Sequence, residues 1–589
     1  MSRTWKLKPL HLADEPVVTI GLAVRMAADT LERSGLGARA DAAAARGGGR
    51  PRQARLSSLM ALSLANWLID RSKGGRLTRA HRLARALKPK HRERLGLDGP
   101  VSYRQVEHGY ARLTEFINMG ALGLPHNHPE IVNVFTGEVQ ECPPDCTYDA
   151  VGQDDFNTRM ALAAAATIRL TGAFAIDATD VECWARARSW DTVPDADPDR
   201  LPQNEDKAAP PRGRKRPSSH DAVWPKIGAD GRHQHTIDVD ARQGWRTSKG
   251  GKLGETFIGW DSTLAANTRL RDQYGEYVCP VIVAVIVRPG GCHKGRAGID
   301  AVDAIERAGV QVREVVADRG YTFCTAPTWA DQLRRRGIEQ TLDLHQLQRG
   351  KRPGPVPETI WVDGGLYTAA MPEGLIDLPA RPMIHDMDAL MTWADKYEPR
   401  SPYRFLPMAT VRRGRRRFKG PALAGKLRCV NTPRSMRGSG PLTNCVNGEK
   451  CGCGITVTVS DSTESRERQR FPFGSHRWVR DYNRREHVES ANASVKVHHT
   501  EIDRKSICVM GLKKVGPMIG YAAAAANLLL VLSTRARAGA APRRYTPVDD
   551  ELPPLDVERR PRPQKNATEN KTTQTFEGAR ATGPPHLAG

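Results

Sequence analysis

Short apolar runs, each ending at a polar residue or a turn signal, recur between residues 171 and 345. Runs of this kind are typical of strands buried in a mixed sheet. The pattern predicts three strands, a helix, a strand, a helix and a final strand, at 173–176, 256–266, 280–287, 297–308, 312–317, 327–336 and 338–344. We therefore expect an α/β fold in which a mixed sheet is flanked by helices.

Helical periodicity characterises the first 130 residues, with apolar positions at helical spacing over 57–70 and a second helix-like stretch at 77–87. The Gly- and Arg-rich stretch 38–53 predicts a flexible basic linker. Because no helix-turn-helix signature stands out, a DNA-binding helical unit and a helical bundle with a solvated face are equally open interpretations. Residues 131–170 are expected to form a connecting helix region.

Three further segments interrupt or follow the sheet. Residues 191–231 have the composition of a disordered linker, and 346–468 look irregular apart from a hairpin predicted at 360–368. Helical character returns over 469–538, and 539–589 has the composition of a disordered tail. We therefore expect the sheet region, 171–345, to be interrupted by 346–468 and completed by 469–538.

Charge and hydropathy narrow the choice of partners. The chain has 89 Lys and Arg against 66 Asp and Glu, a formal net charge of +23, which favours nucleic acid or an anionic membrane surface. The apolar stretch 516–533 is barely of spanning length, is rich in Ala and contains Pro517 and Asn527, so a buried core helix is the better interpretation. The N-terminus has no apolar signal-peptide region, and we expect a cytoplasmic protein.

Two acidic residues stand where an apolar strand is predicted to end. Asp177 follows the run 173–176, and Asp318 follows the run 312–317. A strand end is a rigid position from which a polar group can be exposed for chemistry. Ordinary turn chemistry is the alternative explanation for either residue taken alone.

A third acid lies in a helix-like stretch, 481–499, together with two cations and a phenol. Measured from Tyr482, the side chains of Arg485, Glu489 and Lys496 fall at roughly 300°, 340° and 320° around an α-helix, so all four share one stripe. Such a stripe suits a phosphate-gripping surface with one acid at its centre. A solvated face with ion pairs is the alternative, but it gives no reason for the Tyr or the distant Lys.

These four residues resemble, spacing for spacing, the Y-R-E-K signature of a large group of bacterial insertion-sequence transposases of the DDE type. The sequence DRGY at 318–321 is similar to the second-aspartate motif of that group, and IDAT at 176–179 is similar to the first. The predicted order of strands and helices also resembles the RNase H-like catalytic domain of these enzymes. The resemblance implies an RNase H-like core interrupted by an insertion domain at 346–468, with residues 1–130 as a DNA-end-binding region.

The resemblance also implies roles for the residues. Asp177, Asp318 and Glu489 would bind two Mg²⁺ or Mn²⁺ ions, which stabilise the attacking and leaving oxygens of a phosphodiester during cleavage and strand transfer. Tyr482, Arg485 and Lys496 would hold phosphates at the cut end. Because the linker after the first aspartate strand is unusually long, Asp180 remains open as the first metal ligand.

The partners implied are double-stranded DNA, both as terminal inverted repeats of the element and as target DNA, and further copies of the chain in a synaptic complex. No membrane partner is expected, and the implied location is the bacterial cytoplasm at the nucleoid. Two other functions stay open: an RNase H-like nuclease without strand transfer, and a catalytically inactive DNA-binding protein descended from a transposase.

The segment 346–468 adds three candidate features. The run VRRGRRRFK at 411–419 is expected to bind DNA phosphates through Arg412, Arg413, Arg415, Arg416 and Arg417. Trp361 and Trp393 are candidates for stacking on a base, with a core position as the alternative.

Four thiols within 25 residues are the third feature of this segment: Cys429, Cys445, Cys451 and Cys453. They could form a structural Zn²⁺ site or stay as reduced free thiols, and the spacing leaves both open. Cys142 and Cys146 have no further ligands nearby in the sequence, and we expect no site there.

Overall fold

The computed structural model describes residues 18–45, 54–118, 131–132, 139–140, 151–186, 230–246, 256–271, 273, 277–382, 386–412, 414–502 and 506–537. The predicted tail at 539–589, nearly all of the linker at 191–231, Arg413, Cys142 and Cys146 lie outside these residues.

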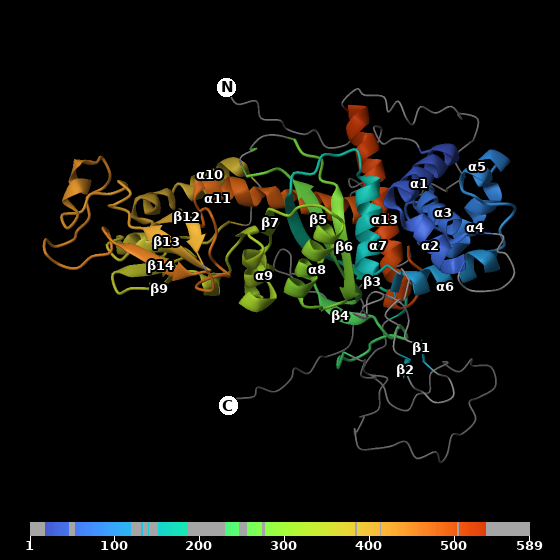
Figure 1. Ribbon diagram of the computed structural model, residues 1–589, viewed down its shortest axis with the longest axis horizontal. Helices are drawn as coiled ribbons and strands as arrows, with labels where there is room; N and C mark the ends of the chain where they lie inside the picture. The colour runs from blue at the N-terminus through green and yellow to red at the C-terminus, as the bar shows by residue number, and fades with distance from the viewer. Residues whose placement is uncertain are drawn as a thin grey trace, which may run out of the picture. The chain divides into compact units, whose positions relative to one another are not determined.

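A mixed sheet forms the centre of the described chain (Figure 1). Its strands lie in the spatial order β6 (Ile282–Pro289), β5 (Thr256–Thr268), β3 (Ala173–Glu182), β7 (Glu314–Ala317) and β8 (Glu339–Leu342). The β6–β5 and β5–β3 pairs are antiparallel, whereas the β3–β7 and β7–β8 pairs are parallel. The prediction of a mixed α/β sheet is confirmed, and β4 (Arg242–Trp245), which pairs with the start of β5, is an addition that the sequence pattern did not reveal.

One face of this sheet is covered by α8 (Lys294–Arg307) and α9 (Ala330–Arg335). The buried cluster between them includes Ala317 and Leu342, the last residues of β7 and β8, and Ile176, the residue of β3 that pairs with Ala317. Side chains alternate between the two faces of a strand. The residues that directly follow Ile176, Ala317 and Leu342 therefore point away from this buried cluster.

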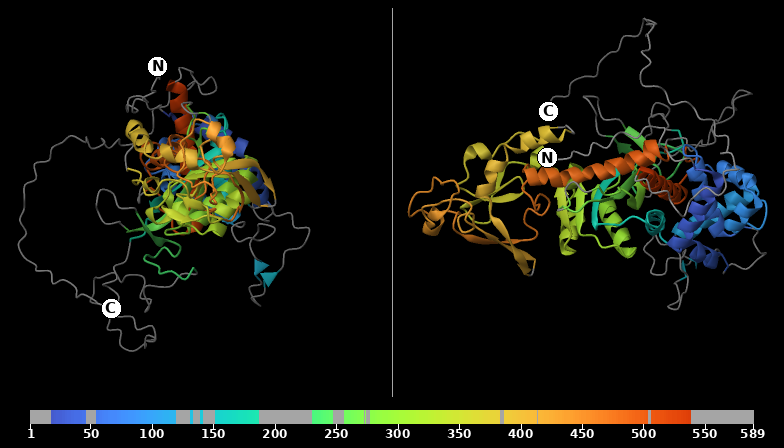
Figure 2. Two further views of the ribbon diagram at one scale, coloured as in Figure 1. Left: turned by 90° about the vertical axis from the view of Figure 1, so that its left-hand side faces the viewer. Right: turned by 90° about the horizontal axis from the view of Figure 1, so that it is seen from above.

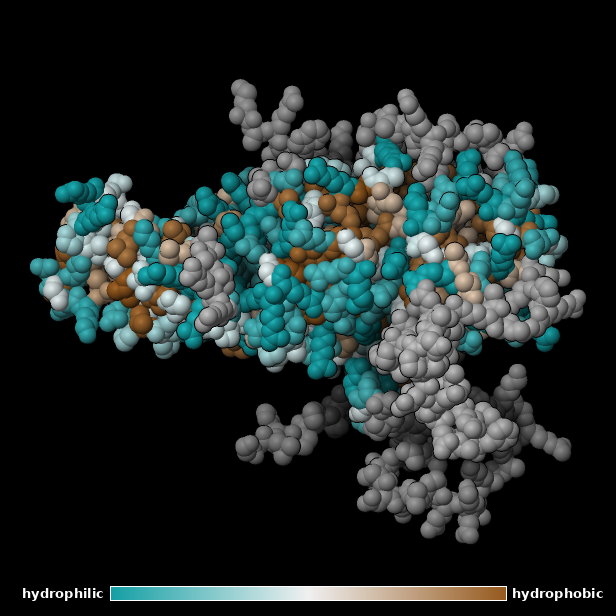
Figure 3. Space-filling model, viewed as in Figure 1, coloured by the Kyte–Doolittle hydropathy of each residue, from teal (hydrophilic) through white to brown (hydrophobic). Residues whose placement is uncertain are grey.

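The apolar stretch that is long enough to cross a membrane is a core helix. The helix α13 (Leu512–Arg537) packs against α7 (Gln153–Ala164) and β6, as Figure 1 shows. It is long and apolar enough to cross a membrane by length and composition, but 94% of its apolar window is buried inside the protein. Figure 3 accordingly shows a visible face on which most side chains are hydrophilic.

The described residues 18–118 form the helices α1 to α6, and α3 packs against α1, α2, α4, α6 and α13. Our prediction of a flexible linker over 38–53 is wrong for its first half, because α2 extends to Ala45. Alanine is the strongest helix former, and Asp41 accepts a hydrogen bond of 3.0 Å from the Ser57 amide of α3, which fixes α2 in place. The bounds are α1 (Ile20–Ser34), α2 (Leu36–Ala45), α3 (Leu56–Ile69), α4 (Leu77–Ala86), α5 (Pro89–Arg94) and α6 (Tyr103–Asn118).

The segment 346–468 is more ordered than its irregular sequence suggests. It contains two three-stranded antiparallel sheets, one of β9 (Lys351–Pro353), β10 (Thr359–Val362) and β11 (Gly365–Thr368), the other of β12 (Leu406–Arg412), β13 (Arg415–Lys419) and β14 (Thr456–Ser460), together with α10 (Met387–Ala394). The predicted hairpin is confirmed, and its turn residues Asp363 and Gly364 both have positive φ, at 48° and 73°.

Shorter elements complete the chain. The two-residue strands β1 (Ile131–Val132) and β2 (Val139–Gln140) pair in antiparallel orientation. Single 3₁₀ turns lie at Arg319–Phe323, Ala326–Thr328, Gln346–Gln348, Glu373–Leu375, Glu398–Tyr403 and Pro433–Arg437.

Asn527, a buried amide within α13, provides a test of this core. Its side chain accepts a hydrogen bond of 2.8 Å from the Ile282 amide and donates to the carbonyls of Ile282 (2.7 Å) and Ala161 (2.9 Å). Replacing it by leucine leaves these buried backbone groups without a partner, which should lower stability by about 1–3 kcal/mol. We expect a reduced midpoint of thermal unfolding for Asn527→Leu, whereas Lys514→Ala, at an exposed position of the same helix, should leave the midpoint nearly unchanged.

Candidate functional site

Three aspartates lie at the same step on three adjacent strands that run in parallel. Our prediction that Asp177 follows the end of its strand is wrong, because pairing with β5 continues β3 to Glu182, and Asp177 lies where the pairing of β3 with β7 ends. Ile176 of β3 is paired with Ala317 of β7, and Ala317 is paired with Leu342 of β8. The next residue on each strand is Asp177, Asp318 and Asp343. Sequence reasoning identified the first two and missed Asp343, although the run before it also ends at an acid.

The side chains of Asp177 and Asp318 are close enough to repel each other. Burial and the neighbouring charge of Asp318 raise the pKa of Asp177 to about 6, against the opposing attraction of Arg485 and Lys294. Asp318 accepts a hydrogen bond of 2.9 Å from the Gly320 amide, and the Lys294 Nζ lies 3.9 Å from its Oδ2. Asp343 is almost completely buried, and burial raises its pKa as well. The edge of the sheet therefore concentrates negative charge.

The helical stretch predicted at 481–499 is present, but it is not one uniform α-helix. It runs through α11 (His476–Tyr482), a 3₁₀ turn (Asn483–Arg485), α12 (Glu486–Ala493) and a π-helical turn (Ser494–His498). The chain in this region is the long orange helix of Figures 1 and 2, and α12 packs against β3 and β5. The stripe of four side chains is therefore altered by a tighter turn near one end and a wider turn near the other.

Arg485 connects the third predicted acid to the other two. Its guanidinium lies 3.6 Å from the Asp177 Oδ2 and forms a close ion pair with the Glu489 carboxylate, one helical turn away. Asp177 is 16% exposed and Glu489 is 38% exposed, so the helix presents Glu489 at the more open side of the site. The predicted acids Asp177, Asp318 and Glu489 are thus gathered at one end of the sheet.

Tyr482 is buried and contacts arginines instead of facing an open surface. Its ring stacks on Trp478 at 5.0 Å between centroids with an interplanar angle of 5°. The guanidinium groups of Arg381 and Arg485 lie over the ring at 5.1 and 5.8 Å. Burial raises the pKa of Tyr482. In this structure the ring therefore supports Arg485 by a cation–π contact, and a direct phosphate contact remains a prediction.

Lys496 forms an ion pair with Asp180, the alternative first ligand. The Lys496 Nζ lies 2.8 Å from Asp180 Oδ1, and Arg246 lies 2.7 Å from Asp180 Oδ2 and 2.6 Å from Glu182. Although burial opposes the effect, hydrogen bonds from Arg246 and Lys496 lower the pKa of Asp180. Asp180 is therefore neutralised by two cations, whereas Asp177 lies beside another acid.

The three carboxylates are not at metal-ligand distances from one another. Among the described residues, one group of three or more potential ligands brings its ligand atoms within 4.8 Å, and that group is the four predicted cysteines. Arg485 lies between two of these acids, in contact with both Asp177 and Glu489, and supplies a positive charge to each.

The cysteine cluster has the geometry of a metal site. Cys429 and Cys451 have their sulfurs 3.6 Å apart, and Cys445 and Cys453 have theirs 3.7 Å apart. A tetrahedral site with Zn–S bonds of about 2.3 Å places its sulfurs about 3.8 Å apart. All four thiols are free, and those of Cys429 and Cys453 are fully buried in a cluster with β10 and β11. The four cysteines could therefore hold a metal ion.

The arginine run forms the tip of the β12–β13 hairpin. Arg412 pairs with Arg415 in the backbone register, Arg415 and Arg417 are exposed, and Arg416 is half-buried. Arg413 lies outside the described residues.

The two candidate stacking residues are core side chains. Trp361 and Trp393 are only 2% and 6% exposed. Neither presents a ring face to a base in this structure, so the alternative that assigns them to the core is the correct one.

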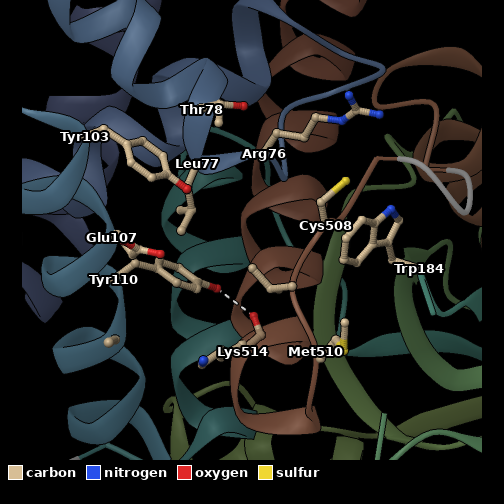
Figure 4. Close-up of a pocket in the computed structure, with 12 residues that line it drawn as sticks. Arg76, Leu77, Thr78, Tyr103, Glu107, Tyr110, Trp184, Cys508, Met510 and Lys514 are labelled. Atoms are coloured by element: carbon tan, nitrogen blue, oxygen red, sulfur yellow. Dashed lines mark hydrogen bonds between the residues drawn. The ribbon is translucent and has the colours of Figure 1, made fainter. Parts of the chain in front are cut away.

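A separate cavity of about 480 Å³ lies between the N-terminal helices and the end of β3 (Figure 4). Trp184 and Tyr103 line it with 45% and 39% of their surfaces exposed, and Arg76 and Lys514 add two cations. Tyr110 donates a hydrogen bond of 2.6 Å to the Lys514 carbonyl, drawn as a dashed line in Figure 4. None of the three aspartates lines this cavity, so it is a different place from the acidic edge.

The raised pKa of Asp177 predicts an unusual dependence of stability on pH. Between about pH 4 and pH 6 the folded protein retains a proton that the unfolded chain has released, so stability falls as the pH rises through this window. Asp177→Asn should therefore raise the free energy of unfolding above pH 6 by an amount on the order of 2–3 kcal/mol, with a higher unfolding temperature, and should matter little near pH 4. The measurement is thermal unfolding from pH 4 to pH 8 with a chelator present.

Asp180→Asn is the matched control, with the opposite sign. Because its pKa is lowered in the folded protein, Asp180 contributes stability at neutral pH that is lost on acidification, and the variant should be less stable than wild type at pH 7. Destabilisation by Asp177→Asn at pH 8 would contradict our description of the acidic edge.

Comparison with known proteins adds no family to this geometry. No family model matches the chain, and neither a curated protein nor a solved structure matches it. The function is therefore inferred from the residues and their arrangement.

Proposed function

We propose that the protein is a DDE transposase that cleaves DNA at the ends of a mobile element and joins them to target DNA. The observation that carries the proposal is the convergence of three acids from distant parts of the sequence. Asp177 and Asp318 follow paired residues of two parallel strands, and Arg485 brings Glu489 to Asp177. These are the acids that the resemblance to the Y-R-E-K transposases nominates.

The topology supports the same proposal. In chain order the strands β3, β5, β6, β7 and β8 give a sheet in which the first three are antiparallel and the last two add in parallel beside the first. This is the arrangement expected of an RNase H-like core. The segment 346–468, with its two small sheets, separates β8 from the helix that bears Glu489 and takes the place of an insertion domain.

The acidic edge fits a divalent cation. Burial and the adjacent Asp318 raise the pKa of Asp177, and a divalent cation at this edge would favour its ionised form. Carboxylate oxygens are the preferred ligands of Mg²⁺ and Mn²⁺. Asp177, Asp318 and Glu489 would hold the metal, which when bound stabilises charge on the attacking and leaving oxygens of a phosphodiester.

Arg485 would then change partners. In this structure it is paired with Asp177 and Glu489, the residues that metal binding requires. A DNA phosphate offers the guanidinium a bidentate partner of the same charge and geometry as a carboxylate. Arg485 would orient the scissile strand, with Tyr482 fixing its position, and Lys496 would contact a second phosphate after leaving Asp180. Exposed arginines of the β12–β13 hairpin would hold the flanking duplex.

We also propose that the cysteine cluster binds a structural Zn²⁺ ion. Four thiolates can close a tetrahedral site, and the sulfur separations of 3.6 and 3.7 Å suit one. The ion would link the two ends of the segment 429–453, which packs against the β10–β11 hairpin.

Two other functions differ from the proposal in what they do with DNA. A nuclease without strand transfer would use the same acids and stop after cleavage. An inactive descendant would bind DNA and cleave nothing.

Cleavage and joining of DNA test the proposal directly. Purified protein is incubated with end-bearing duplex, target DNA and Mg²⁺ or Mn²⁺. Wild type should release free 3′ ends and join them to target DNA, whereas Asp318→Asn and Glu489→Gln should each lower the rate by at least about 100-fold because a metal ligand is lost. Asp388→Asn, at an exposed position of α10, is the matched control and should retain the activity.

The products separate the alternatives. Cleavage without joining supports the nuclease, and binding without cleavage supports the inactive descendant. Full activity in Glu489→Gln would remove Glu489 from the active site.

Metal analysis tests the zinc site. Protein purified without chelators should contain about one zinc ion per chain, as expected for four thiolates closing a single tetrahedral site. Cys451→Ser should lose the ion and unfold at a lower temperature, because metal binding contributes folding free energy. Cys508→Ser, outside the cluster, should retain the zinc. Wild-type protein that binds no zinc after reduction and reconstitution would contradict the site.

A further inference from the structure

Three arginine side chains from separate segments meet where α9 adjoins the 346–468 segment. They are Arg334 of α9, Arg416 of β13 and Arg468, which follows β14. Arg334 donates hydrogen bonds to the carbonyls of Ser465 (2.9 Å) and Arg468 (3.2 Å), and Arg468 donates to the carbonyls of Ser460 (3.0 Å) and Asp461 (3.1 Å). Both arginines are therefore held in place by backbone groups.

Arg416 faces this cluster because side chains along β13 alternate between the two faces of the strand. Arg415 and Arg417 are exposed, whereas Arg416 is half-buried and points to the side on which Phe418 is buried. Its backbone pairs with Val459 of β14, which fixes the register of the hairpin. The middle arginine of the basic run is therefore turned toward Arg334 and Arg468.

The positive charge of the cluster is poorly compensated. The carboxylate of Asp461 accepts a hydrogen bond of 3.2 Å from Arg468. Asp331 and Glu464 contribute further attraction, but Glu464 is already ion-paired with Arg352. Burial is the main cause that lowers the pKa of Arg334, to about 9, and the charges of Arg468 and Arg416 lower it further against the attraction of Asp461 and Asp331.

Donor groups in the cluster also lack acceptors. The Nε atoms of Arg334 and Arg416 are buried and have no hydrogen-bond partner. Among the described residues, no hydrogen bond or ion pair is found for the Arg416 guanidinium at all. Buried donors without acceptors are rare and unfavourable, and a polyatomic anion would satisfy several at once.

We propose that Arg334, Arg416 and Arg468 form a phosphate-binding site, and that its occupant is a backbone phosphate of bound duplex DNA. The proposal rests on the DNA-binding part of the proposed function and adds a specific position to it. Arg415 and Arg417 are exposed on the opposite side of the same strand, so they extend the positive charge of the cluster around the β12–β13 hairpin without facing the same surface. The site would fix the DNA at the join between the sheet domain and the 346–468 segment.

Inorganic phosphate is the first probe. In chloride buffer of low ionic strength, phosphate should raise the midpoint of thermal unfolding of wild type, because the anion neutralises the cluster. Arg416→Gln should raise the midpoint without phosphate, since it removes an uncompensated charge, and should abolish the response to phosphate. Arg335→Gln, at an exposed neighbouring position with the same change of charge, should respond as wild type does.

Duplex DNA is the second probe. Each phosphate that a protein neutralises contributes about 1 to the slope of log K against log salt concentration. Arg416→Gln should lower this slope by about 1 and weaken binding several-fold for any sequence, whereas Arg335→Gln should keep the wild-type slope. Arg334→Gln is a second test variant and should behave as Arg416→Gln does.

The outcomes separate this site from the function it rests on. A phosphate response that depends on Arg416, with an unchanged slope for DNA, would mean that the occupant is a free anion and would overturn the DNA assignment. No Arg416-dependent response to either probe would overturn the site. A changed slope in a protein that cleaves no DNA would support the site and contradict the transposase.

Discussion

The pairing of β7 between β3 and β8 is the constraint on which the candidate site depends. Parallel pairing brings the carboxyl ends of β7 and β8 level with the middle of β3, and the register places an aspartate at the same step on each strand. Side chains this close cannot all ionise freely in a partly buried setting, so cations gather around them from several elements. Lys294 comes from α8, and Arg485 comes from the helix that packs on β3 and β5.

Much of the central sheet could be predicted because its signal is local. A strand such as β6 is apolar at nearly every position, and this marks it without knowledge of its neighbours. The segment 346–468 was harder, since β13 consists largely of basic residues and its strand pairing, with β12 on one side and β14 on the other, is not visible in its composition. The helix α2 was missed because Gly and Arg beyond its end dominated the composition of the stretch.

The candidate site could be predicted as far as the spacing of residues along the sequence determines which face of a helix they share. The spacing of Arg485 and Glu489 placed both on one helical face, and they do form an ion pair. What Tyr482 and Lys496 contact could not be deduced in the same way, because Trp478, Arg381 and Asp180 reach them from elsewhere in the fold. Asp343 escaped notice for a related reason: its neighbours across the sheet are defined by strand register, which a linear sequence does not contain.

The double contact of Arg485 has a consequence for control. A side chain that neutralises two acids keeps the resting protein stable while it occupies the place where chemistry would begin. Under the proposed function, a metal ion would compete with this internal counter-ion, and DNA would meet an arginine that is already ion-paired. Binding of DNA to Arg485 would free Asp177 and Glu489 for the metal ion, and binding of the metal ion to these acids would free Arg485 for DNA. The two binding events would therefore favour one another. An enzyme arranged in this way would act as a coincidence detector, inert toward either signal by itself.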